Sequence, residues 1–184
     1  MNKSSWKFQR AFTLVELLVV IAILGVLVTI GLVSFASAQA RGRDTERKSD
    51  LKQIATALEL YYSDYGKYPT SIGGEIGGCP STTPVACVWG ASGSSSQFTD
   101  GKTVYFKAIP KDPSSNFNYY YCAVTVGSVA NQGFQLFAKL ENSQDQDCLG
   151  GNCGTHADLP AGVTCGGTGT CNFAITSPNV TPTE

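Results

Sequence analysis

Residues 10–40 read RAFTLVELLVVIAILGVLVTIGLVSFASAQA, and this stretch decides the fold. From Leu17 to Ala40 there are 24 residues without a charged side chain. As a helix they would reach about 36 Å at about 1.5 Å per residue, which exceeds the bilayer core of about 30 Å. The stretch therefore predicts a transmembrane helix. Glu16 lies at its entry, where a plain membrane anchor needs no acid.

The start of this stretch carries a family resemblance. A basic leader, the small residue Ala11, the run Phe12-Thr13-Leu14-Val15-Glu16 and an apolar helix resemble the type IV prepilin signal of type IV pilins and type II secretion pseudopilins. The resemblance implies that a prepilin peptidase cuts between Ala11 and Phe12 on the cytoplasmic side and that the new Phe12 amine is methylated. It also implies an assembly role for Glu16. The family usually has Gly before the cut, so Ala11 is a departure.

A secretory signal peptide is the alternative interpretation of the N-terminus. Ala36-Ser37-Ala38 has the A-x-A pattern that signal peptidase accepts. Its apolar region would, however, run well past the usual length of about 7–15 residues and would contain Glu16. We therefore interpret residues 1–11 as a leader peptide and leave them out of the fold.

Charge is distributed unevenly along a chain whose net charge is -1. Residues 41–52 hold five bases and three acids, whereas residues 53–184 hold five bases and ten acids. The large C-terminal part is acidic, so no specific nucleic-acid partner is predicted. The basic segment follows the apolar helix directly, and contact with lipid headgroups is its simplest interpretation.

The helix is expected to continue beyond the apolar stretch, over residues 39–69. One face of this continuation is apolar at i, i+3, i+4 and i+7 spacing, so it needs a packing partner. Gly66 permits the left-handed conformation that ends a helix, and Pro69 prevents the helix from resuming. The end is therefore predicted near Tyr65. The apolar positions are Leu51, Ile54, Ala55, Leu58, Tyr61, Tyr62 and Tyr65.

Residues 70–184 are predicted to form a globular head. Residues 70–101 show no regular period and are interpreted as a loop, in which Trp89 and Phe98 are packing anchors. Three antiparallel strands are expected at 103–109, 118–126 and 133–140, because these runs are rich in aromatic and β-branched residues. Residues 141–171 are interpreted as a long loop, and 176–184 as a tail that frays.

The expected fold class is thus α+β. A long N-terminal helix, transmembrane over 12–38 and amphipathic over 39–69, packs on a small antiparallel sheet of about three strands with disulfide-rich loops. This is the arrangement that the family resemblance also implies. The lone histidine, His156, lies in an irregular loop, and no catalytic arrangement or phosphate-binding loop accompanies it. We therefore do not expect an enzyme.

All seven cysteines follow the apolar helix, in a region rich in Gly, Ser and Thr that is typical of an extracytoplasmic domain with disulfides. Zinc binding is the alternative, but zinc sites favour tighter C-x2-C spacing and a reducing compartment. Cys79 and Cys87 are close enough in sequence to be the expected local pair, and the remaining connectivity stays open. The seven are Cys79, Cys87, Cys122, Cys148, Cys153, Cys165 and Cys171.

An acidic loop follows the last expected strand. Glu141, Asp145 and Asp147 offer hard oxygen ligands at which calcium could bind with loop carbonyls, although no EF-hand pattern is present. The position resembles that of the calcium loop in major pseudopilin heads. Two interpretations stay open, a calcium site and a solvated acidic loop, and no cofactor is required in either.

The function expected from these features is that of a filament subunit. It would be held in the inner membrane with an extracytoplasmic head and then assembled by an inner-membrane platform into a type IV pilus or a secretion pseudopilus. Its partners would be further subunits, the prepilin peptidase, the platform and membrane lipid. A single-pass anchored binding module that does not polymerise is the alternative.

Overall fold

A computed structural model of the 184-residue chain describes residues 12–79, 85–91, 93–151, 153–154, 159–166 and 170–182, and for residues 30–34, 94 and 95 it describes the backbone alone. Ala11 and His156 lie outside the described residues. The chain divides after Gln39 into two compact units. We call them the N-terminal unit and the head unit, and we describe each by itself.

The helix α1 runs from Leu14 to Tyr65 over 52 residues and contributes to both units. It ends where the sequence predicts: Gly66 has φ 64° and its N–H donates to the Tyr62 carbonyl at 2.7 Å. The expected membrane-spanning half is not confirmed, because no helix among the described residues has the length and apolar character to cross a bilayer.

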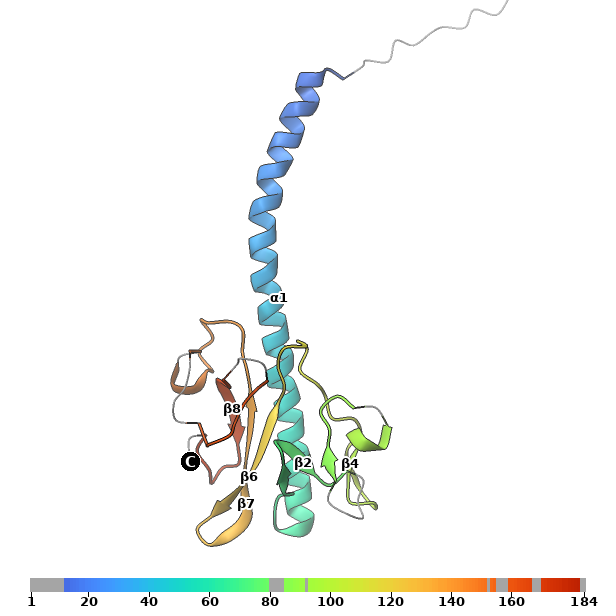
Figure 1. The fold of residues 1–184 in the computed structure, drawn as a ribbon, viewed down its shortest axis with the longest axis vertical. Helices are drawn as coiled ribbons and strands as arrows, with labels where there is room; N and C mark the ends of the chain where they lie inside the picture. The colour runs from blue at the N-terminus through green and yellow to red at the C-terminus, as the bar shows by residue number, and fades with distance from the viewer. Residues whose placement is uncertain are drawn as a thin grey trace, which may run out of the picture. The chain divides into compact units, whose positions relative to one another are not determined.

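The main sheet of the head unit has the order β6-β7-β8 and is antiparallel throughout. Its strands are β6 (Tyr120–Val126), β7 (Val129–Ala138) and β8 (Phe173–Thr176) (Figure 1). Leu136 of β7 pairs with Tyr121 on one side and with Ile175 on the other. The predicted strands at 118–126 and 133–140 are therefore confirmed, while β8 was not predicted.

Two smaller sheets correct the prediction for residues 70–109. The first has the order β1-β2-β3 and the second pairs β4 with β5. Residues 70–101 are thus not a plain loop, and the strand expected at 103–109 is shorter and belongs to a different sheet from β6 and β7. The elements are β1 (Ser71–Ile72), β2 (Glu75–Gly77), β3 (Ala86–Cys87), β4 (Phe98–Thr99) and β5 (Val104–Phe106), with 3-10 turns η1 (Gly93–Ser96) and η2 (Leu149–Gly151).

The core of the head unit lies between the C-terminal part of α1 and the sheets. In Figure 1 the β6-β7-β8 sheet lies on one side of this part of α1, and β4 lies on the other. Leu51 and Leu58 of α1 are fully buried, together with Tyr121 and Leu136 of the main sheet. This confirms the predicted apolar face and its partner. Tyr65 is an exception: its side chain is 45% exposed, because it stands on the last turn of the helix.

The C-terminal segment is packed, which corrects the prediction of a frayed tail over its described residues. Ser177 and Val180 are buried at 1% and 7% exposure. The Gln135 side chain donates to the Thr181 carbonyl at 2.7 Å. Gly133 makes room for this packing, since a Cβ there would lie 2.2 Å from Cγ2 of Val180.

Three disulfides fix the loops of the head unit. Cys79 bonds to Cys87, which is the predicted local pair, and the other bridges also join close neighbours in sequence. Each bridge closes a short loop, so each restrains local structure and none cross-links elements that are far apart in the sequence. Cys122 on β6 has a free, half-buried thiol. The other bridges are Cys148–Cys153 and Cys165–Cys171.

Candidate assembly site

Exposed apolar side chains mark the first part of α1, in the N-terminal unit. Phe12 and Leu14 are 81% and 80% exposed, and the large apolar residues from Leu17 to Val28 are all between 48% and 61% exposed. A soluble helix would bury one apolar stripe and show a polar face to water. Over residues 17–28 this helix is apolar on every side, so it exposes an apolar surface that needs a covering partner.

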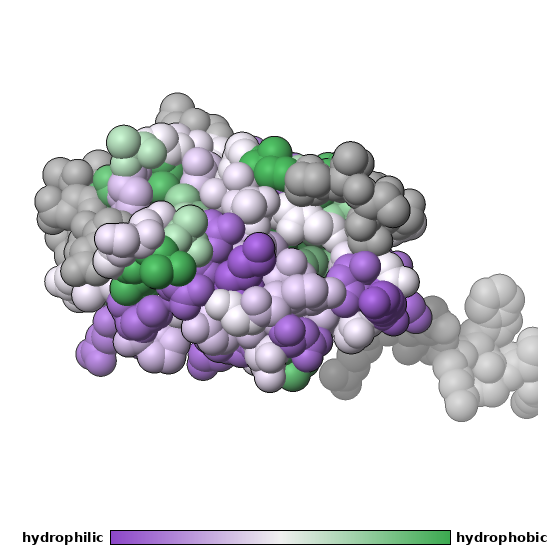
Figure 2. Space-filling view, turned by 90° about the horizontal axis from the view of Figure 1, so that it is seen from below, coloured by the Kyte–Doolittle hydropathy of each residue, from purple (hydrophilic) through white to green (hydrophobic). Residues whose placement is uncertain are grey.

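The head unit contrasts with this apolar helix. On the face seen from below in Figure 2, the described residues are mostly hydrophilic and the hydrophobic ones lie in small groups. Its exposed large apolar residues, such as Val104 and Val129, are few beside those of residues 12–28. The apolar surface that needs a partner is therefore concentrated in the N-terminal unit.

Glu16 closes the first turn of α1 by a reciprocal cap with Thr13. The Thr13 backbone N–H and hydroxyl both donate to Glu16 Oε2 at 2.8 Å. In return the Glu16 N–H donates to the Thr13 hydroxyl oxygen at 3.2 Å. This is a capping box, which satisfies backbone donors at a helix start. The carboxylate is thereby fixed beside the residue that follows Phe12.

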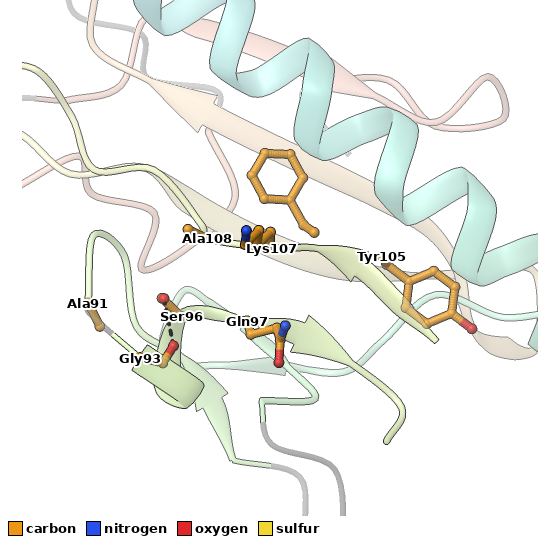
Figure 3. Close-up of a pocket in the computed structure, with 8 residues that line it drawn as sticks. Ala91, Gly93, Ser96, Gln97, Tyr105, Lys107 and Ala108 are labelled. Atoms are coloured by element: carbon orange, nitrogen blue, oxygen red, sulfur yellow. Dashed lines mark hydrogen bonds between the residues drawn. The ribbon is translucent and has the colours of Figure 1, made fainter. Parts of the chain in front are cut away.

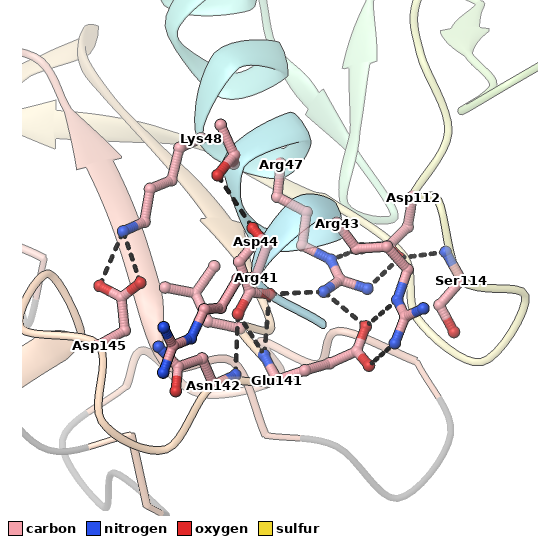
Figure 4. A network of polar contacts seen from close by, with 12 residues as sticks. Arg41, Arg43, Asp44, Arg47, Lys48, Asp112, Ser114, Glu141, Asn142 and Asp145 are labelled. Carbon is pink, nitrogen blue, oxygen red and sulfur yellow. Dashed lines mark hydrogen bonds and ion pairs between the residues drawn. The ribbon is translucent and has the colours of Figure 1, made fainter. Parts of the chain in front are cut away.

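A buried ion network holds α1 to two connections of the head unit (Figure 4). Arg47 is 0% exposed. Its Nε and Nη2 donate to the two carboxylate oxygens of Asp112 at 2.7 Å each, in a bidentate pair. Its Nη1 donates to Asp44 at 2.7 Å and pairs with Glu141 at 2.8 Å. The guanidinium thus joins the helix to the β5–β6 and β7–β8 connections.

Asp44 completes the network from the helix side. Its carboxylate accepts the backbone N–H of Glu141 at 2.9 Å and that of Asn142 at 2.8 Å. Arg43, one residue earlier, donates through Nε to Glu141 at 2.8 Å. The start of the acidic loop is therefore bound to α1 through both its backbone and its side chain.

Lys48 binds the two aspartates of the acidic loop. Its ammonium donates to Asp145 and to Asp147 at 2.7 Å each. The expected ligands are therefore divided: Glu141 pairs with arginines, and the two aspartates pair with a lysine. Among the described residues no group of three acidic, His or Cys side chains is placed to hold a metal. The structure does not bring the three carboxylates together as a ligand set.

The ion pairs shift the titration of the groups involved. The hydrogen bond from Arg43 and the proximity of Arg47 lower the pKa of Glu141 to about 2. Burial alone would lower the pKa of Arg47, but its hydrogen bonds to Asp112 and Glu141 outweigh burial and raise it. For Asp145, burial raises the pKa, and the hydrogen bond from Lys48 outweighs burial and lowers it. Glu141, Arg47 and Asp145 are therefore charged at neutral pH.

A hollow of the head unit lies between η1 and β5 and has a volume of about 860 Å³ (Figure 3). Its walls are the backbone and small side chains of the η1 turn and the Tyr105–Ala108 strand end. Ser96 donates within the wall to the Gly93 carbonyl at 3.0 Å. No acid, histidine or cysteine lines it among the described residues, so it offers no acid-base pair.

The family comparisons agree with the N-terminal features. The family described as "Prokaryotic N-terminal methylation motif" matches residues 6–32. The type IV major pilin protein PilA of Myxococcus xanthus is 39% identical over 72 residues, which are 39% of this chain and 32% of PilA. The chain therefore matches about a third of the length of PilA. No solved structure is significantly similar to the chain.

The similarity to type II secretion proteins covers more of both chains. Type II secretion system core protein G of Pseudomonas aeruginosa is 31% identical over 121 residues, 65% of this chain and 78% of that protein. The protein of the same name from Escherichia coli is 30% identical over 110 residues, 59% of this chain and 68% of that protein. A match of this length extends beyond α1 into the head. The chain therefore belongs to the pilin and pseudopilin family that includes type II secretion system core protein G.

Proposed function

We propose that this protein is a structural subunit of a filament that assembles through the N-terminal part of α1. The observation that carries the proposal is the helix that is exposed and apolar on every side over residues 17–28. In a filament these helices would cover one another, and before assembly lipid would cover them. The subunit needs neither a catalytic site nor a cofactor for this role.

Similarity over more than 100 residues to core protein G favours a pseudopilus over a pilus. The match to PilA is shorter and fits within the length of α1 and a small part of the head. We therefore propose a secretion pseudopilus as the filament. Its subunits would lie with their heads on the filament surface, which suits the hydrophilic surface of the head unit in Figure 2.

The proposed route begins in the inner membrane. A prepilin peptidase would cut between Ala11 and Phe12, and the Phe12 amine would be methylated, as the motif over residues 6–32 supports. Residues 12–38 would hold the subunit in the membrane with the head outside the cytoplasm, where disulfides persist. An assembly platform would then extract it into the filament.

Glu16 would set the register of assembly. Cleavage would create a positive amine on Phe12, directly before the Thr13–Glu16 cap, and the amine of an incoming subunit could meet Glu16 of the subunit already docked. An unpaired carboxylate among apolar helices is costly, so the pair would favour one axial position. The capping box shows that the carboxylate is held at the helix start, where the amine would lie.

The test is Glu16→Val in native-host cells that lack the chromosomal copy, with Glu46→Val, an exposed acid further along α1, as the matched control. We expect Glu16→Val to be processed at Phe12 and inserted normally but to form few or no filaments. Intact mass and N-terminal sequencing report processing, membrane fractionation reports insertion, and electron microscopy reports filaments. Glu46→Val should form filaments like the wild type.

Two outcomes would contradict the proposal. Abundant filaments from Glu16→Val would remove the role of Glu16 in register while leaving filament formation standing. A wild-type chain that keeps Met1, or that begins at Gln39, would contradict processing at Phe12 and with it the pseudopilin route.

A further inference from the structure

A second, smaller pocket of the head unit lies where the β1–β2 turn meets β3, the start of β6 and the loop before Cys165. Its volume is about 360 Å³, at the small end of the range of about 300–1,000 Å³ for ligand pockets. The assembly features described above use none of its residues. Its walls are Gly73, Gly74, Glu75, Val88, Trp89, Asn118, Tyr119, Tyr120, Thr164 and Gly166.

Glu75 gives this pocket its charge. It is the only charged residue among the described residues that line the pocket, and its carboxylate forms no hydrogen bond or ion pair with any described residue. It is half-buried on β2, whose next residue, Ile76, points into the core at 0% exposure. Burial raises the pKa of Glu75, and no described cation offsets that burial. A half-buried carboxylate without a partner is a charge for which a ligand can supply the counter-ion.

Aromatic rings from Trp89, Tyr119 and Tyr120 form the other walls. The Tyr120 ring lies directly against the backbone of Gly74, where a Cβ would come within 2.5 Å of the ring. Glycine at this position therefore leaves the space that the ring occupies. The Trp89 and Tyr119 rings meet edge to face at a centroid distance of 5.6 Å. Aromatic walls beside a carboxylate attract organic cations through the negative ring faces.

The polar groups of two of these rings, Trp89 and Tyr119, are already used inside the protein. The Trp89 indole N–H donates to the Gly74 carbonyl at 3.2 Å, and the Tyr119 hydroxyl donates to Asp50 at 2.8 Å. A sugar needs several free donors and acceptors around it, whereas a cation needs a carboxylate and ring surface. Glu75 supplies the carboxylate and the rings supply the surface, while Asn118, Thr164 and the Tyr120 hydroxyl add polar groups, so a sugar is the alternative that the experiment must separate.

We propose that this pocket binds a small organic cation with a quaternary ammonium group, held by Glu75 and the rings of Trp89 and Tyr120. The ligand would be a free solute. Neither filament assembly nor processing is part of the proposal, so the two can fail separately.

Binding can be followed by tryptophan fluorescence, because Trp89 lines the pocket. The chain has two tryptophans, Trp6 and Trp89, so replacing Trp6 by Phe leaves Trp89 as the only one. The protein is the full chain with Trp6→Phe, kept in octaethylene glycol dodecyl ether micelles, a detergent with neither a cation nor a sugar. Choline chloride is titrated while the fluorescence of Trp89 is recorded. The neutral isostere 3,3-dimethylbutan-1-ol, methyl glucoside and glycerophosphocholine are titrated in parallel.

We expect a saturable change with choline and none with the neutral isostere or the sugar. Glu75→Gln should raise the Kd for choline by about tenfold or more, because it removes the charge and keeps the shape. Glu75→Asp should retain binding, and Glu46→Gln, which removes a charge outside the pocket, should leave the Kd unchanged. Far-UV circular dichroism checks that each variant is folded.

Four results would overturn the proposal: no saturable change with choline, an equal response to the neutral isostere, tighter binding of methyl glucoside than of choline, or a Kd unchanged in folded Glu75→Gln. Tighter binding of glycerophosphocholine than of choline would also overturn it, because a phosphate would then be favoured beside Glu75 and a lipid headgroup would be the source.

Discussion

Replacing Arg47 by Met is the most informative perturbation of the head unit. Arg47 is 0% exposed, and its guanidinium is the cation of a network that contains Asp44, Asp112 and Glu141. Met has a similar length and no charge, so it fills the space and removes only the polar contacts. The variant leaves Asp112, whose side chain is also 0% exposed, without a cation.

The size of the effect follows from the charge that is left behind. Breaking a buried ion pair by removing one partner costs about 3–5 kcal/mol, since the other charge stays buried. Asp112 keeps the Ser114 N–H at 2.8 Å, and Asp44 keeps two backbone N–H groups of the acidic loop. These remaining donors place the expected loss near the lower end, at about 3 kcal/mol of unfolding free energy at pH 7.

The pH dependence supplies a second, independent signature. In the wild type, Glu141 has its pKa lowered from 4.5 to about 2, so its contribution to stability is present above about pH 4.5 and is lost as the pH falls toward 2. In Arg47→Met, Glu141 loses the hydrogen bond and the proximity of Arg47, so the pKa of its carboxyl is lowered less than in the wild type. The difference in unfolding free energy between wild type and variant should therefore shrink as the pH falls from about 4.5 toward 2.

The measurement is urea unfolding of the full chain carrying Trp6→Phe in nonionic micelles, followed by Trp89 fluorescence with the disulfides intact. Arg41→Met is the matched control, because Arg41 lies on the same helix but is exposed, and it should stay within about 0.5 kcal/mol of the wild type. Adding Asp112→Asn to Arg47→Met should recover part of the loss. A loss below about 1 kcal/mol at pH 7, or one that is as large at about pH 2.5 as at pH 7, would refute this reasoning.

Three further predictions concern the loops. Replacing Cys79 and Cys87 by Ser should cost about 2.5 kcal/mol, since the bridge closes a loop of 8 residues, and urea unfolding measures it; an unchanged midpoint would contradict this estimate. Gly133→Ala should cost about 1–3 kcal/mol, because its Cβ would meet Val180, and it should increase amide exchange in residues 177–182; unchanged exchange would mean that the tail does not pack there. Lys48→Met should make the melting temperature rise with calcium more than in the wild type, where the ammonium already bridges Asp145 and Asp147. Equal melting temperatures of Lys48→Met in calcium and in chelator would rule out a calcium site there.

The parts of the fold that the sequence predicts well are long, and residues close together in the sequence determine them. Leu51, Ile54 and Leu58 repeat at helical spacing, and Gly66 with Pro69 leaves the helix only one place to end. The strand β6 has seven residues, of which five are Tyr, Val or Thr, so strand-forming residues outnumber the rest. The strand β7 has ten residues, and only its second half, which contains Phe134 and Phe137, was recognisable as a strand.

The missed strands are short. β1, β3 and β4 have two residues each, and a period of two cannot be recognised in two residues. β8 has four residues, and it is fixed by pairing with β7 some 40 positions earlier. Its partner, and not its own sequence, makes it a strand. The tail after it is ordered for the same reason, because β7 supplies the contacts.

The ion network shows why a search for apolar residues can underestimate the length of a buried helix face. Leu51, Ile54 and Leu58 form a buried stripe with steps of three and four residues, and continuing the stripe toward the N-terminus gives Arg47 and Asp44. A search for apolar residues stops at Leu51, whereas the packed face continues for two more positions. Two opposite charges at i and i+3 on an extrapolated buried stripe therefore indicate a buried ion pair, because a charge in that position needs a partner. Asp44 and Arg47 could have been found by this rule. Asp112, which lies 65 residues beyond Arg47, could not, since only the tertiary fold brings it to the guanidinium.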